Sequence, residues 1–137
     1  MVIMAFCASA ALAGCGDGRP TRVPVSGHVL IDGKPLTYGY VEFAPANSRA
    51  STGGLDQDGK FVLTCFEPGD GVVPGKQRIA VRAQEPIGAE NMKWHAPKKY
   101  ADMDSSGLTQ DITGPTDSVV INLTWDGAPG PFVEKHH

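Results

Sequence analysis

The spacing of apolar residues constrains this sequence most, because they recur at every second position over several runs. Val25, Val29 and Ile31 fall on one side of the first run, and the runs 79–83 and 119–125 alternate in the same way. A period of two places successive side chains on opposite faces of a β-strand, whereas an amphipathic helix needs apolar residues three or four positions apart. No window of about twelve residues fits the helical period, so the sequence predicts strands.

Glycine and proline are frequent between these runs, with 17 Gly and 11 Pro in the 137 residues of the chain. The pair Asp58-Gly59 is typical of a tight turn, since glycine adopts the positive φ that such turns require. It lies between the runs 51–55 and 60–66, which we therefore expect to form a hairpin.

We count about seven short strands with regular turn spacing, which is typical of a β-sandwich. The sequence thus predicts an all-β fold, a single Ig-like or prealbumin-like sandwich over residues 24–126. Residues 127–137 are expected to be a C-terminal tail. A chain of 137 residues is long enough for one such domain.

The first 14 residues carry no charge and consist mostly of apolar side chains. This composition is typical of the hydrophobic part of a signal peptide, and the stretch is too short to cross a bilayer. It ends in Leu12-Ala13-Gly14-Cys15, which resembles the lipobox of bacterial lipoproteins. The resemblance implies that Cys15 receives a diacylglyceryl group and that the chain is cleaved just before it.

These observations predict an exported protein held at the cell membrane or outer membrane by a lipid on Cys15, with residues 15–23 as a tether. A signal peptide normally begins with basic residues, but the first basic residue here is Arg19. Either the true start lies upstream of Met1, or export is inefficient or absent.

Several motifs in the body of the chain fit one family of sandwich domains. They are V-x-G-x-V at 25–29, D-G-K-P-L at 32–36 and D-x-D-G-K-F at 56–61. Together they resemble the carboxypeptidase-regulatory-like (transthyretin-like) domain, and with the lipobox they are similar to a group of small bacterial lipoproteins. The resemblance implies a sandwich fold and export, whereas this fold carries unrelated functions in different proteins.

The charge pattern argues against nucleic acid as a partner. The formal net charge is -3, and Lys98-Lys99 is the only basic pair. Nucleic-acid binding normally requires a clustered basic face. We therefore expect a membrane partner through the lipid anchor, together with an envelope protein or a glycan.

No cofactor or metal is expected from the residue types and their spacing. The four histidines, His28, His95, His136 and His137, do not have the spacing of a zinc site. Asp56 and Asp58 resemble the start of a calcium loop, but the residues that follow supply no further ligands, which favours a turn.

We also expect no catalytic site. Cys65 alternates with apolar neighbours and is expected to be a buried core residue. No serine lies in a nucleophile-elbow context. The transthyretin-like family includes a hydrolase of 5-hydroxyisourate that ends in Tyr-Arg-Gly-Ser, and this chain ends in Val133-Glu134-Lys135-His136-His137 instead.

Residues 84–107 are predicted to be a long loop, and loops of this length are often functional. Trp94, His95 and Tyr100 are its candidate ligand-binding residues. Alternatively, the two large aromatic rings pack the loop against the edge of the sandwich. Two functions therefore remain open: a non-catalytic structural or interaction module, and a lipoprotein that binds a ligand, such as a carbohydrate, with this loop.

Overall fold

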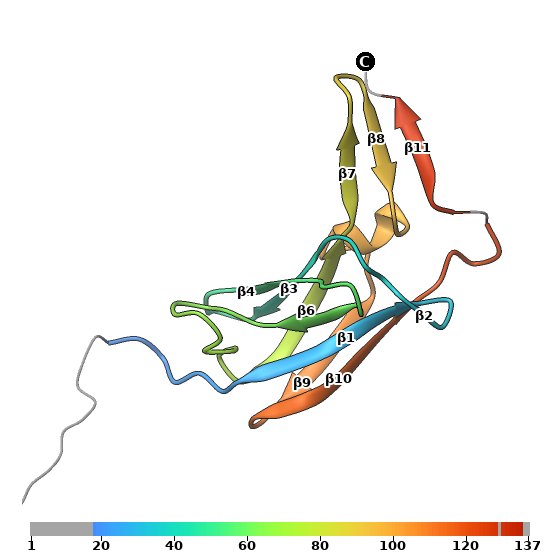
Figure 1. Cartoon of the computed structure of the whole chain (residues 1–137). Helices are drawn as coiled ribbons and strands as arrows, with labels where there is room; N and C mark the ends of the chain where they lie inside the picture. Colours follow the sequence, from blue (N-terminus) through green and yellow to red (C-terminus); the bar gives the residue numbers. More distant parts are fainter. Residues whose placement is uncertain (1–17, 129, 136–137) are drawn as a thin grey trace, which may run out of the picture.

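A computed structural model describes residues 18–128 and 130–135 of the chain, and confirms the all-β prediction (Figure 1). The predicted leader, Cys15 and the terminal histidines 136 and 137 lie outside these described residues. In chain order, the elements are β1 (Val25–Ile31), β2 (Lys34–Pro35), β3 (Tyr40–Pro45), β4 (Ser51–Gly54), β5 (Lys60–Val62), β6 (Gly75–Arg82), β7 (Gln84–Ile87), β8 (Asn91–Trp94), the 3-10 helix η1 (Lys98–Ala101), β9 (Leu108–Ile112), β10 (Thr116–Leu123) and β11 (Phe132–Lys135).

Two four-stranded sheets form the sandwich. In the first sheet, β1 pairs with β10 on one side and with both β2 and β5 on the other; the second has the order β4-β3-β6-β9. The β1–β10 pair is parallel, whereas the other strand pairs are antiparallel.

The core lies between these two sheets, as the alternation of apolar residues predicts. Its buried side chains include Val25, Val29, Phe61, Val119 and Ile121 from the first sheet, and Val41, Phe43, Ile79, Val81 and Ile112 from the second. The rings of Phe43 and Phe61 meet across the interface with their centroids 5.9 Å apart. The removal of these apolar side chains from water provides the main stabilisation of the sandwich.

The turn at Asp56–Gly59 forms as predicted, but the two strands beside it do not form a regular hairpin. β4 pairs with β3 in one sheet and β5 pairs with β1 in the other, so only one bridge, Thr52–Thr64, joins the two segments. The Asp56 carboxylate accepts hydrogen bonds from the backbone N–H groups of Lys60 and Asp58, and these bonds lower its pKa. The turn thus carries the chain from one sheet to the other.

The prediction of a loop over residues 84–107 is wrong for its first half. β7 and β8 form an antiparallel hairpin, and β11, from the predicted tail, pairs with the other side of β8. Gln84, Trp94 and Phe132 lie side by side in this third sheet. Proline and glycine near 86–88 suggest a loop in the sequence, but the proline lies on the edge strand β7, where a missing N–H costs little.

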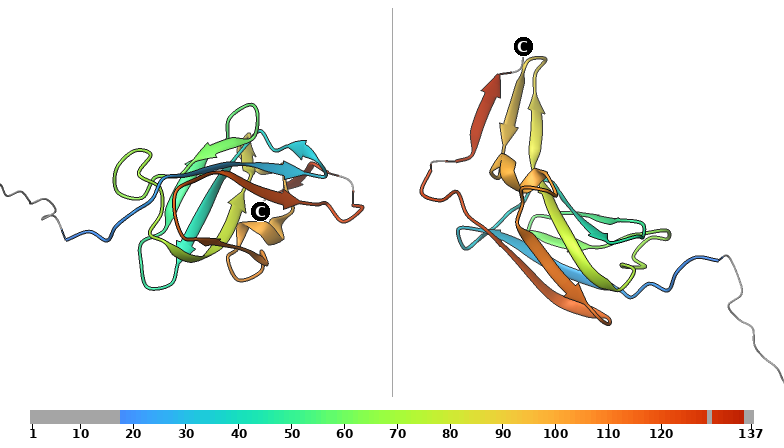
Figure 2. Two further views of the ribbon diagram at one scale, coloured as in Figure 1. Left: turned by 90° about the horizontal axis from the view of Figure 1, so that it is seen from below. Right: turned by 180° about the vertical axis from the view of Figure 1, so that it is seen from behind.

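The two ends of the sandwich differ in what they carry. We call the end where β1 and β10 begin the entry end, because Val23 there pairs with Val72 as the chain enters the domain. The end where β1, β6 and β10 finish is the far end. The third sheet projects from the far end, away from the N-terminal segment (Figures 1 and 2).

Candidate functional site

Trp94, the first of the residues singled out in the sequence, is part of the packing of the third sheet. Its side chain is 9% exposed and its ring stacks on Phe132 with centroids 6.4 Å apart. Its Nε1 donates a hydrogen bond to Glu134 at 3.3 Å, and the Lys98 ammonium lies 5.4 Å from its ring centroid. Little of this ring is available to a ligand.

Tyr100 has a similar supporting position at the base of the third sheet. It is 5% exposed, and its hydroxyl both accepts a hydrogen bond from the Thr124 N–H at 3.2 Å and donates one to the Thr124 carbonyl at 3.4 Å. These bonds fasten η1 to the chain that leaves β10. The arrangement matches the packing alternative that the sequence left open.

His95 is the most accessible of the three. Its ring stacks on Tyr38 with centroids 4.7 Å apart, and its Nε2 lies 2.8 Å from a carboxylate oxygen of Glu85. The structure therefore separates these residues: Trp94 and Tyr100 support the fold, while His95 reaches the surface of the far end.

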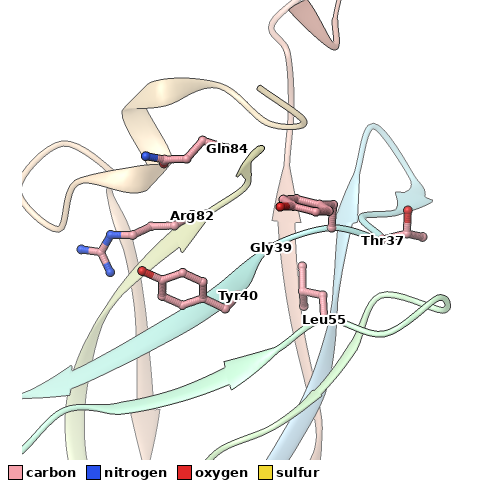
Figure 3. Close-up of a pocket in the computed structure, with 7 residues that line it drawn as sticks. Thr37, Gly39, Tyr40, Leu55, Arg82 and Gln84 are labelled. Carbon is pink, nitrogen blue, oxygen red and sulfur yellow. The ribbon is translucent and has the colours of Figure 1, made fainter. Parts of the chain in front are cut away.

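A cleft at this far end is the best candidate site among the described residues, and the sequence did not point to it. The cavity measures about 470 Å³ (Figure 3). We call it the tyrosine cleft, and its lining is Thr37, Tyr38, Gly39, Tyr40, Leu55, Arg82 and Gln84. Clefts of roughly 300–1,000 Å³ are typical of small-molecule sites.

The local fold brings both tyrosines to the same cleft. Tyr38 and Tyr40 flank Gly39, which has φ +114 and lies so close to β6 that an added Cβ would be 2.3 Å from the Arg82 carbonyl oxygen. Only glycine fits such a contact without displacement of the backbone. Tyr38 and Tyr40 remain 36% and 42% exposed, so part of each ring is open to solvent.

Arg82 lies opposite Tyr40 in the pairing of β3 with β6. Its guanidinium lies beside the Tyr40 ring (Figure 3), with the guanidinium carbon 5.9 Å from the ring centroid. Its Nη1 forms an ion pair with Glu42. Partial burial alone would lower the pKa of Arg82, but the hydrogen bond and the charge of Glu42 outweigh it and raise the pKa. Glu42 thus keeps the guanidinium charged, holds it in one orientation and balances its positive charge.

A second cleft of about 500 Å³ adjoins the first and shares Thr37 with it. His95 and Trp125 are the aromatic residues of its lining. Asp32 holds this region in place, because its carboxylate accepts hydrogen bonds from the Thr124 hydroxyl at 2.8 Å and from the Trp125 N–H at 3.4 Å. Two neighbouring clefts with aromatic linings therefore open at the far end.

The entry end is built around charged pairs. Arg19 pairs with Glu67 at 2.9 Å and Arg22 with Asp70 at 3.0 Å. The guanidinium carbons of three arginines lie 4.7–5.0 Å from the centroid of the Phe66 ring: Arg19, Arg22 and Arg49.

Asp70 organises the turn beside this cluster. Its carboxylate accepts hydrogen bonds from the backbone N–H groups of residues 65–67 and from Arg22. Desolvation would raise the pKa of Asp70, but these hydrogen bonds outweigh it and lower the pKa to about 2. Cys65, in the same turn, is 4% exposed, as predicted for a core residue.

Neither a metal cluster nor a membrane-spanning helix is found in the part of the chain that the structure describes. Over residues 18–128 and 130–135, no three His, Cys, Asp or Glu side chains are grouped as metal ligands. Within the same ranges, no helix has the length and apolar character needed to cross a bilayer.

Comparison with known proteins adds no assignment. No protein-family model matches the sequence, and no curated protein and no solved structure matches the chain.

One feature of the sequence fits the tyrosine cleft, although the sequence prediction placed the site on residues 94–100. Two tyrosines flank a glycine at 38–40, where a connection leads into the run 40–45, and connections usually lie on the surface and often carry binding residues. Arg82 and Gln84 had no such signal. The register of β3 with β6 brings Arg82 to Tyr40, and Gln84 follows two residues later at the start of β7.

Proposed function

We propose that this chain is a lipid-anchored envelope protein whose sandwich acts as a non-catalytic structural or interaction module. The observation that carries the proposal is the division between the two ends of the domain. The chain enters at one end, while the third sheet lies at the other (Figure 1). Two clefts lined by aromatic side chains open at that other end, and the rings of Tyr38 and Tyr40 in the first are exposed. A membrane anchor before the entry end would leave the far end turned toward other molecules.

The proposed anchor is a thioether-linked diacylglyceryl group on Cys15, with cleavage after Gly14. Two acyl chains hold a protein firmly at a bilayer, because each buried CH₂ contributes about 0.8 kcal/mol. Arg19 is already tied to the domain by Glu67. The link from Cys15 to Arg19 therefore spans at most about 14 Å, which would keep the entry end close to the lipid surface.

The family assignment is part of the same proposal. The all-β fold with two packed sheets is compatible with a carboxypeptidase-regulatory-like (transthyretin-like) domain, and the motifs at 25–29, 32–36 and 56–61 support it. The third sheet is an addition to the sandwich of about seven strands that the alternation and turn spacing predict.

A second candidate function, ligand binding, is favoured by the tyrosine cleft. The sequence placed this function on Trp94, His95 and Tyr100, two of which are buried. The exposed rings of Tyr38 and Tyr40 are better placed to contact a ligand.

The anchor is tested by expressing the full chain in a bacterial host and measuring the intact mass of the membrane-extracted product. We expect a mature chain that begins at Cys15 and carries added acyl mass, and a Cys15→Ala variant that keeps residues 1–14 and gains no lipid. A wild-type product in the cytosol with residues 1–14 attached and an unmodified thiol would refute the proposal.

A further inference from the structure

We propose that the tyrosine cleft is a binding site for an uncharged oligosaccharide. The ligand class deepens the proposed function, since it names what an interaction module at the far end would hold. The binding chemistry itself depends only on the cleft and can be tested separately from the anchor.

The exposed rings provide the apolar part of such a site. Tyr38 and Tyr40 are exposed by 36% and 42%. The Tyr38 ring stacks on His95 and the Arg82 guanidinium lies beside the Tyr40 ring, so a ligand would contact the parts of each ring that these neighbours leave open. The C–H faces of a sugar ring are apolar and flat enough to lie against an aromatic face. Tyrosine suits this contact, because its ring is apolar and its hydroxyl remains able to hydrogen-bond.

Polar groups around the rings match the hydroxyl groups of a sugar. Arg82 at the end of β6 and Gln84 at the start of β7 line the cleft together with Thr37, and Figure 3 shows the Arg82 guanidinium on the side of the Tyr40 ring and Thr37 on the opposite side. The amide of Gln84 both donates and accepts, and a guanidinium can donate two parallel bonds to adjacent oxygens. Glu42 already orients the Arg82 side chain, so little freedom is lost when a ligand binds.

The charge balance of the cleft selects an uncharged ligand. Arg82 is the only charged side chain among the lining residues, and Glu42 forms an ion pair with it. A uronic acid or a sulfated sugar would have to compete with the Glu42 carboxylate for the guanidinium, and its own charge would lie near that carboxylate. A neutral sugar avoids both costs.

The adjoining cleft indicates a ligand of more than one sugar unit. Thr37 lines both cavities, of about 470 and 500 Å³, and Tyr38 stacks on His95 where the two regions meet. Trp125 offers a further ring in the second cavity. A chain of sugars that crosses Thr37 could thus contact aromatic faces in both.

The test is calorimetric titration of the full chain, purified in detergent, with neutral gluco-, xylo- and manno-oligosaccharides and with a uronic-acid oligomer of similar length. We expect at least one neutral oligomer to bind and the uronic-acid oligomer to bind more weakly. Tyr40→Ala and Gln84→Ala should each weaken binding by about fivefold, since an aromatic contact or a hydrogen bond contributes on the order of 1 kcal/mol and about 1.4 kcal/mol corresponds to tenfold. Tyr40→Phe should retain most of the affinity.

Matched controls come from the outer face of the other sheet. Val120 is 43% exposed and Asn122 is exposed on β10, so Val120→Ala and Asn122→Ala should bind like the wild type. Circular dichroism verifies that each variant is folded. The inference is overturned if no neutral oligomer binds, if the uronic-acid oligomer binds best, or if folded Tyr40→Ala and Gln84→Ala variants both retain full affinity. None of these outcomes would affect the mass measurement at Cys15, so the two proposals fail independently.

Discussion

The entry end and the far end of this domain use aromatic and basic side chains in opposite ways. At the entry end, three guanidinium groups surround Phe66, and two of the arginines are paired with Glu67 and Asp70. At the far end, the single arginine of the tyrosine cleft lies beside rings that remain exposed. Arginine and aromatic side chains thus pack together at the entry end, whereas at the far end the aromatic rings stay exposed. The surroundings of these residues, rather than their chemistry, determine whether the rings are covered.

The comparison predicts that substitutions at the entry end reduce stability, whereas substitution of the exposed tyrosines of the cleft leaves it nearly unchanged. The largest effect is expected at Gly71, which has φ +95 and lies so close to the incoming chain that an added Cβ would be 1.7 Å from the Val23 carbonyl oxygen. Gly71→Ala should cost about 3 kcal/mol of unfolding free energy, because the backbone would have to move.

Chemical denaturation measures this cost, and Gly54→Ala is the matched control. Gly54 pairs with Tyr40 near the cleft, and a Cβ there would meet nothing within 4 Å. If both glycine variants were equally stable, the close contact at the entry end would not be the constraint we describe.

Asp70→Asn should cost about 2 kcal/mol at neutral pH, because the pKa of Asp70 is lowered from 3.8 to about 2 in the folded chain. A group with a lowered pKa stabilises the fold above its unfolded value, and this stabilisation is lost as the pH falls through the folded value. The difference from the wild type should therefore shrink between about pH 4 and pH 2. Thermal melts at several pH values would reveal this, and a difference that stays constant with pH would contradict it.

Tyr100→Phe tests whether Tyr100 supports the fold at the far end, in contrast to Tyr40, which is proposed to contact a ligand. The variant removes a hydroxyl that bonds with both backbone groups of Thr124, so we expect a loss of about 1 kcal/mol. Binding of an oligosaccharide should be unchanged, since Tyr100 lines neither cleft. A variant of normal stability that binds sugar poorly would reverse the roles given to Tyr100 and Tyr40.

The smallest effect on stability is expected for Tyr40→Ala. The side chain is 42% exposed, and surface substitutions of this kind usually change stability by about 0.5 kcal/mol or less. The same variant is expected to lose sugar affinity. Its denaturation curve should therefore stay close to that of the wild type, while its titration shows weaker binding. A large loss of stability would show that Tyr40 supports the fold, as Phe66 does at the entry end.

The parts of the fold that could be predicted from the sequence depend on local patterns. Alternation identified the strands that hold Val29, Ile79 and Ile121, and the burial of Cys65 followed from the same period. The turn at Asp58-Gly59 could also be predicted from a local pattern, since the nearby Asp56 carboxylate and a glycine with positive φ are enough to form it.

The third sheet could not be predicted in this way. Trp94 pairs with Phe132, which follows it by 38 positions, and neither β8 nor β11 alone has a clear apolar period. Polar residues such as Asn91 and Lys135 have low strand propensity, so the pairing depends on the partner strand. A pattern within one segment contains no information about a partner so distant.

The sequence alone determined the all-β class, the position of the core strands and the turns between them, because periodicity and glycine geometry act over a few neighbouring residues. The tertiary structure alone decided that β1 and β10 run parallel, that the terminal segment completes the third sheet, and that Tyr40 lies opposite Arg82. Strand register determines which side chains lie together, because a shift of one residue would turn every side chain of the strand to the other face.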